Sequence, residues 1–138
     1  MIAIFMLDDR KGMMFNHRRQ SRDSQVTHKI LELAGNGTLR MSPYTYELFE
    51  DVQTNVHVIV SDRFLDKARE NDFCIIEEGK VPCADQISKV IVFWWNRIYP
   101  GDVFLDIDLE NKYWFLESWE EFPGSSHEKI TMEVYKHE

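Results

Sequence analysis

The chain has 138 residues, and 43% of them are hydrophobic, including nine Phe, five Tyr and four Trp. This composition excludes a disordered chain, which has too little apolar area to form a core. The formal net charge of −8 disfavours non-specific binding to nucleic acid or to an anionic membrane surface. A chain of this length predicts a single domain over residues 1–138.

The apolar run at residues 1–7 has no basic segment before it and is too short for a signal peptide or a spanning helix. It predicts a strand buried on both faces. Cys74 and Cys83 do not form a CxxC pattern, so we expect both to be reduced thiols. Together these features predict a cytoplasmic protein that has no membrane partner.

A helix is predicted to follow the first strand and its loop. Ser21 or Asp23 can cap it. Gly35 or Gly37 can end it. Its apolar face would consist of Val26, Ile30, Leu33 and Ala34.

The rest of the chain continues the alternation and then becomes rich in strands. Pro43 suits the first turn of a short helix over 43–51, and DRFLDKARE (62–70) predicts a helix of two turns. Further strands are predicted at residues 38–42, 55–61, 73–76, 89–99, 102–108, 112–122 and 129–138. This order predicts an α/β layered domain with a mostly parallel sheet and an antiparallel C-terminal edge.

Several segments also carry motifs in a fixed order. RMSPYTYELF (40–49) is similar to M-G-R-x-T-[YW]-E-S, and VHVIVSDR (56–63) is similar to a strand that ends V-L-[ST]-R. VPCADQISKVIVFWWNRIYPGDVFLDID (81–108) is similar to L-P-x-A-D-x-[IL]-x-[IL]-T followed by G-D-x-x-F-P-x-[IL]-D. With the ends of the chain, residues 1–16 and 114–138, these segments resemble the dihydrofolate reductase family. The resemblance implies a three-layer α/β/α dihydrofolate reductase-like fold.

The resemblance also implies an NADPH site, but the residues that would contact the cofactor are changed. Ser42 and Pro43 replace the glycine and arginine of the M-G-R-x-T turn, which removes a bidentate phosphate donor. Met14 replaces the second glycine of a G-I-G loop, and it either narrows the nicotinamide site or fills the core. Thr45 and Ser61 remain as candidate cofactor-binding residues. Thr45 has the alternative of bonding within its own helix turn.

Two acidic residues stand where the family has a glycine pair that opens a helix and receives the pyrophosphate. Glu77 and Glu78 would repel the phosphates there, and several residues of that helix are missing. The segment 62–72 is also short, so we expect the adenosine pocket to lack a wall. The sequence therefore predicts no cofactor, with NADPH bound only in an altered pose.

The family also has a carboxylate on its first helix that orients the pterin and supports its protonation. Asp23 is the candidate for this catalytic role if a short deletion follows Asn16. A catalytic acid there would have a raised pKa, because burial disfavours the charged form. An ordinary first-turn aspartate would only interact with the helix dipole. Both roles remain open.

A basic cluster lies beside the implied mouth of the pocket. Arg18, Arg19 and Arg22, with Asn16, are candidates to bind an anionic ligand. Alternatively, the arginines belong to a solvated loop and pair with the surplus acids. The aromatic run 93–95 either stacks on a planar ligand or belongs to the core. The histidines show no metal-ligand spacing, so we expect no metal.

The leading hypothesis is a divergent dihydrofolate reductase-like protein without conventional NADPH-dependent reductase activity. It would bind an unidentified small molecule in the cleft between the first helix and the sheet, as a monomer or homodimer, and would not bind nucleic acid. One alternative is an active pterin or folate oxidoreductase with altered cofactor use. Another is a non-catalytic partner-binding or structural module whose cleft is filled by Met13, Met14 and Phe15.

Overall fold

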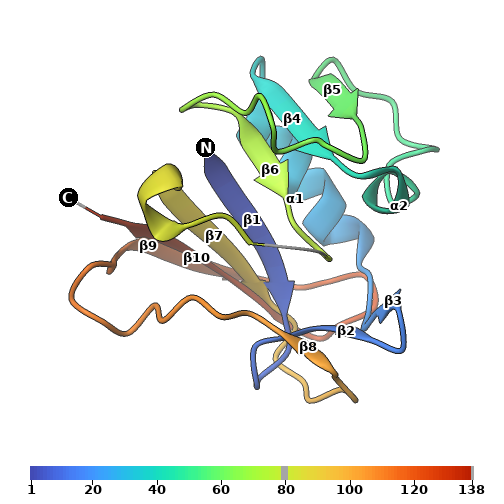
Figure 1. The fold of residues 1–138 in the computed structure, drawn as a ribbon. Helices are drawn as coiled ribbons and strands as arrows, with labels where there is room; N and C mark the ends of the chain where they lie inside the picture. The colour runs from blue at the N-terminus through green and yellow to red at the C-terminus, as the bar shows by residue number, and fades with distance from the viewer. Residues whose placement is uncertain (79–80, 138) are drawn as a thin grey trace.

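A seven-stranded sheet forms the centre of the computed structural model, which describes residues 1–78 and 81–137 (Figure 1). In spatial order its strands are β5 (His57–Val60), β4 (Thr38–Met41), β6 (Phe73–Ile75), β1 (Ile2–Leu7), β7 (Lys89–Trp94), β10 (Ile130–Lys136) and β9 (Phe115–Phe122). The first five run parallel to one another, and β10 is antiparallel to both of its neighbours, β7 and β9. The predicted mostly parallel sheet with an antiparallel C-terminal edge is confirmed.

A second, three-stranded sheet lies beside the end of β1. It consists of β3 (Arg18–Arg19), β2 (Gly12–Phe15) and β8 (Val103–Phe104). Asn16 and His17 join β2 to β3, and both have positive φ angles, 50° and 64°. This is the geometry of a two-residue hairpin turn whose twist matches the flanking strands. The sequence predicted only a loop at residues 8–16, and it predicted a longer strand at 102–108.

The helix α1 (Ser24–Ala34) forms where the sequence predicts it. Asp23 is the N-cap and accepts a hydrogen bond from the Gln25 backbone N–H, and Gly35 ends the helix with a φ of 53°. Val26 and Ile30 face the sheet and are fully buried. They pack in one apolar cluster with residues of β1, β4, β7 and β10. Apolar side chains therefore fill the space between this face of α1 and the sheet.

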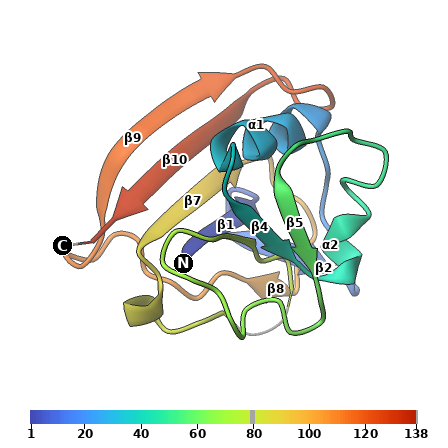
Figure 2. The same ribbon diagram turned by 90° about the horizontal axis from the view of Figure 1, so that it is seen from above.

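The other face of the sheet is covered mainly by irregular segments and not by a second long helix. Figure 2 shows α1 on one side of the sheet and β8 on the other. The second face buries a separate apolar cluster that includes Met13, Met14 and Trp114. Only the short helices α2 (Pro43–Tyr46) and η1 (Ala84–Gln86) accompany α1 in the described residues. The predicted α/β architecture is confirmed, whereas its second helical layer is reduced to these elements.

The two-turn helix predicted over residues 62–70 is wrong. The segment forms tight turns, in which Asp66 N–H bonds to the Arg63 carbonyl and Ala68 N–H bonds to the Leu65 carbonyl. These bonds join residues three apart and do not continue as an α-helix. A helix this short gains too few hydrogen bonds to offset the cost of nucleation, and here only Phe64 is buried.

The aromatic run and the two cysteines behave as core residues and free thiols. Phe93 and Trp95 are buried in the cluster beneath α1, which confirms the core interpretation. Cys74 and Cys83 are both free, as predicted. Burial raises the pKa of the Cys74 thiol to about 11. No helix in the described part of the chain is long and apolar enough to cross a membrane.

Replacement of Ile30 by Ala should lower the free energy of unfolding by about 2–5 kcal/mol, because Ile30 is fully buried between α1 and the sheet. Urea unfolding followed by circular dichroism measures this change. His28→Ala is the matched control on the exposed face of the same helix, and it should change stability by less than about 0.5 kcal/mol. Equal effects of the two substitutions would contradict the packing of α1.

Candidate functional site at the carboxyl edge of the sheet

The parallel strands place their carboxyl ends along one edge of the sheet, where ligands bind in open α/β folds. Polar side chains follow several of these strands. Asp8 follows β1, Ser42 follows β4 and Ser61 follows β5, while Glu77 comes two residues after the end of β6. Asp8, Ser42 and Glu77 are buried. The β2–β3 hairpin also reaches this edge, through the contacts described next.

Arg19 on β3 forms a bidentate ion pair with Glu77. Its Nε lies 2.9 Å from Glu77 Oε2, and its Nη2 lies 3.1 Å from Oε1. The side chain of Glu77 is 4% exposed and that of Arg19 is 14% exposed. Burial alone would lower the Arg19 pKa, but the hydrogen bonds and charge of Glu77 outweigh it, so the pKa is raised. Arg19 is therefore charged at neutral pH and paired with Glu77.

Thr45 completes the environment of Glu77. Its hydroxyl donates to Glu77 Oε1 over 2.9 Å, and its backbone N–H donates to Ser42 Oγ over 3.2 Å. Ser42 is thus the N-cap of α2, and Pro43 occupies the first turn. Thr45, which the sequence predicted as a cofactor-binding residue, uses its hydroxyl to bind an internal carboxylate.

Tyr44 fixes Arg19 from a second side. The Arg19 guanidinium lies 4.1 Å from the centroid of the Tyr44 ring. The Arg19 backbone N–H donates to the Tyr44 hydroxyl over 2.8 Å, and Nη2 donates to the Tyr44 carbonyl over 3.0 Å. Arg19, Tyr44, Thr45 and Glu77, which we call the Arg19 lock, therefore join β3, α2 and the segment after β6.

Asp8 organises the loop between β1 and β2. Its carboxylate accepts hydrogen bonds from the backbone N–H groups of Gly12, Arg10 and Tyr99 and from Gln20 Nε2. Burial would raise the Asp8 pKa, but these donors outweigh it and the pKa is lowered. A Cβ at Gly12 would meet Gln20 Nε2 and the Asp8 carboxylate. A larger residue there would have to displace these side chains from their hydrogen bonds.

Three of the predicted ligand-binding residues line one small cavity. Asn16, Arg18 and Arg19 border a space of about 240 Å³, together with Phe15, Gln20, Tyr99 and Pro100. Gln20 Oε1 is buried and has no hydrogen-bond partner among the described residues. Arg22 is exposed and does not border this cavity, although the sequence grouped it with the others. We call this space the mouth cavity.

A second cavity of about 390 Å³ lies where the sequence predicted an incomplete adenosine pocket. Ser42, Phe64 and Leu65 border it, and its charged lining consists of Asp62, Arg63, Asp66 and Glu78. Arg63 Nε is already paired with Asp66 Oδ2 at 2.6 Å. The lining is therefore net acidic, which disfavours a phosphate group. The other cofactor-binding candidate, Ser61, is exposed, and its Oγ accepts from the Arg63 N–H.

Comparison with solved structures shows which known fold this chain shares. The chain is similar to a dihydrofolate reductase from Enterococcus faecalis complexed with NADP(H) and RAB-propyl, with a TM-score of 0.65 and 16% sequence identity. The match covers 99% of this chain and 95% of that one. The chain has a dihydrofolate reductase-like fold. No family model matches the sequence, and no curated protein is similar to it in sequence.

At the carboxyl edge, the groups of the Arg19–Glu77 pair and Thr45 that could contact a phosphate are already engaged within the protein. The guanidinium of Arg19 and the hydroxyl of Thr45 both bind Glu77. The neighbouring cavity carries three carboxylates and one paired arginine. A dianionic phosphate brought to Arg19 would have to displace Glu77, and one brought to the neighbouring cavity would approach carboxylates. Among the described residues, no group of acidic, histidine or cysteine side chains is placed to hold a metal ion.

Asp23 is a helix cap joined to the turn between β9 and β10. Its carboxylate lies 2.9 Å from His127 Nδ1 and accepts from the backbone N–H groups of Gln25, Ser125 and Ser126. Burial would raise the Asp23 pKa, but these partners outweigh it and the pKa is strongly lowered. This direction is opposite to the raised pKa that a catalytic acid would have, and the predicted N-cap at Asp23 is confirmed.

His127 extends this network on its other side. Its Nε2 lies 2.9 Å from the Tyr99 hydroxyl and 3.0 Å from Ser21 Oγ, and its ring stacks on Trp95. The sequence pattern gave no indication of these partners, nor of Gln20 and Tyr44 at the edge. They come together only through tertiary contacts between distant segments. In the sequence, only the acidic residues after β6 pointed to the contact between Arg19 and Glu77, because a buried carboxylate needs a cation.

Asp23→Asn should lower the free energy of unfolding at neutral pH by about 1–3 kcal/mol, because Asn caps a helix but cannot replace the charge in these hydrogen bonds. The Asp23 pKa is lowered by folding, so its contribution is present above about pH 4, the pKa of an unfolded Asp, and is lost as pH falls below it. Urea titrations between pH 3 and 7 should show the difference from the wild type narrowing below pH 4. A constant difference would contradict the account, and Asp51→Asn is an exposed control.

Proposed function

We propose that this protein is a divergent dihydrofolate reductase-like protein that lacks conventional NADPH-dependent reductase activity. One observation supports this above all: Glu77 binds both Arg19 and Thr45 at the carboxyl edge. The protein thus supplies its own anion to groups that a phosphate-binding site would leave available. We also propose, from the sequence, that it acts in the cytoplasm.

The same proposal includes a small-molecule ligand, bound at the mouth cavity and not beneath α1. The space beneath α1 is filled by Val26, Ile30 and their core partners. The mouth cavity instead has the exposed Arg18 and the exposed ring of Phe15. An arginine favours a carboxylate, and an exposed aromatic ring favours a flat apolar body. The ligand would be a small aromatic acid.

Titration with NADPH and an assay of dihydrofolate reduction test the first part of the proposal. We expect no binding of NADPH at micromolar concentrations and no oxidation of NADPH with dihydrofolate, because the phosphate donors are occupied by Glu77. A dihydrofolate reductase that binds NADPH is the positive control. Micromolar binding would contradict the proposal. Binding together with turnover would instead favour the altered-cofactor oxidoreductase.

The ligand is tested separately with 4-hydroxybenzoate and its uncharged amide, each followed by NMR chemical-shift changes. The acid should perturb residues around the mouth cavity more strongly than the amide. Arg18→Gln should weaken binding of the acid by roughly threefold or more, since an exposed ion pair contributes only modestly. Arg22→Gln, outside the cavity, should leave the affinity unchanged. Equal shifts from acid and amide would contradict an anion site.

A further inference from the structure

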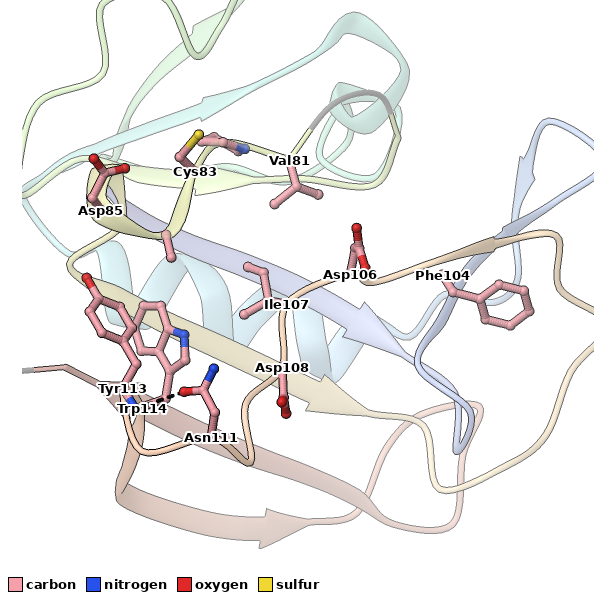
Figure 3. A pocket seen from close by; sticks show the side chains of 12 residues that line it. Val81, Cys83, Asp85, Phe104, Asp106, Ile107, Asp108, Asn111, Tyr113 and Trp114 are labelled. Carbon is pink, nitrogen blue, oxygen red and sulfur yellow. Dashed lines mark hydrogen bonds between the residues drawn. The ribbon is translucent and has the colours of Figure 1, made fainter.

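A large cavity lies between η1 and the segment that follows β8. It has a volume of about 870 Å³, within the range of small-molecule sites. Figure 3 shows Val81, Cys83 and Asp85 on one side and residues 104–114 on the other. We call it the η1 cavity. It belongs to the face of the sheet opposite α1, because Trp114 and Ile107 pack with the second apolar cluster.

Two aromatic rings form a preorganised wall of the η1 cavity. Trp114 is 5% exposed, and its ring meets the Tyr113 ring edge-on, with centroids 5.2 Å apart. His137 stacks on Tyr113 with centroids 4.7 Å apart, and its Nε2 lies 2.7 Å from the Ile87 carbonyl oxygen. The two rings thus contact His137, the residue after β10, and His137 is bound in turn to Ile87, the residue after η1. A ligand that packs on this wall would cause little reordering.

The charged groups that border the η1 cavity are all carboxylates, among the residues that the structure describes. They are Asp85, Asp106 and Asp108. Asp108 accepts a hydrogen bond from the Glu110 N–H, whereas Asp85 and Asp106 are exposed and form no ion pair with a described residue. Asp106 points toward Val81 on the opposite wall (Figure 3). The cavity therefore combines an aromatic wall with unpaired negative charge.

We propose that the η1 cavity binds a small organic cation, a protonated amine attached to a flat apolar body. The apolar body would pack against Trp114, Tyr113 and Ile107, since this surface would otherwise remain in water. The ammonium group would lie near Asp85 and Asp106, where opposite charges attract. The same carboxylates disfavour an anionic ligand of equal shape. This site is independent of the mouth cavity and of its proposed ligand.

The probe pair is 2-phenylethylamine and 3-phenylpropanoate, which share an aromatic body and differ in the sign of their charge. Binding to the full chain is measured by calorimetry at low salt. The readout at the site is the rate at which N-ethylmaleimide modifies Cys83, which is exposed and borders the cavity. Cys74 is buried with a raised pKa and should not react. We expect the amine, and not the acid, to bind and to slow the modification of Cys83.

Substitutions of Asp85 and Asp106 test whether these two carboxylates bind the amine. The double variant Asp85→Asn, Asp106→Asn should weaken binding of the amine by roughly tenfold, whereas the exposed control Asp51→Asn should not change it. Both variants keep side-chain size, and their urea unfolding curves check that each is folded. Equal binding of amine and acid, no binding of the amine, or unchanged affinity in the double variant would each overturn the proposal. Protection of Cys83 by CaCl2 but not by the amine would also overturn it.

Discussion

The ion pair between Arg19 and Glu77 is the interaction on which the carboxyl edge of this protein depends. Glu77 comes shortly after β6, in the interior, and a buried carboxylate is costly unless it is paired and hydrogen-bonded. Arg19 supplies the charge and Thr45 supplies a further donor. Because Arg19 lies on β3, pairing with Glu77 fixes the hairpin. The same contacts therefore offset the cost of burying the Glu77 carboxylate and determine which groups remain available to a ligand at the carboxyl edge.

The ion pair also bears on function, because Arg19 and Thr45 are the hydrogen-bond donors that Glu77 occupies. An arginine and a hydroxyl beside a strand end are groups suited to a phosphate. In this chain they bind an internal carboxylate, while the neighbouring cavity is acidic. The chain has the dihydrofolate reductase-like fold, as the structural similarity shows. Two cavities that could take ligands are the mouth cavity beside Arg18 and the η1 cavity on the other face.

The sequence predicted the fold well wherever local physical rules act. The cap at Asp23, the stop at Gly35 and the apolar face of α1 can be read from neighbouring residues, and so can the parallel strands. The β2–β3 hairpin was missed because its turn, Asn16-His17, lacks the usual glycine. The helix over 62–70 was predicted from composition, although the segment is too short to sustain one.

The candidate site was less predictable, because its contacts join segments far apart in the chain. The sequence indicated that Glu77 was wrong for a phosphate, but not that Arg19 would pair with it. It selected Asn16, Arg18 and Arg19, which share a cavity, and Arg22, which does not border it. It left two roles open for Asp23, and it did not indicate that backbone N–H groups and His127 would surround this cap. Such outcomes depend on tertiary pairing, which residue spacing does not encode.

A double-mutant cycle on Arg19→Met and Glu77→Gln tests the central claim most directly. Each single variant should lower the free energy of unfolding by about 3 kcal/mol, since it leaves the other charge without its partner. The double variant should cost clearly less than the sum, with a coupling energy of about 2 kcal/mol. Costs that add to within about 0.5 kcal/mol would mean that Arg19 and Glu77 act independently, and would contradict the account of the carboxyl edge.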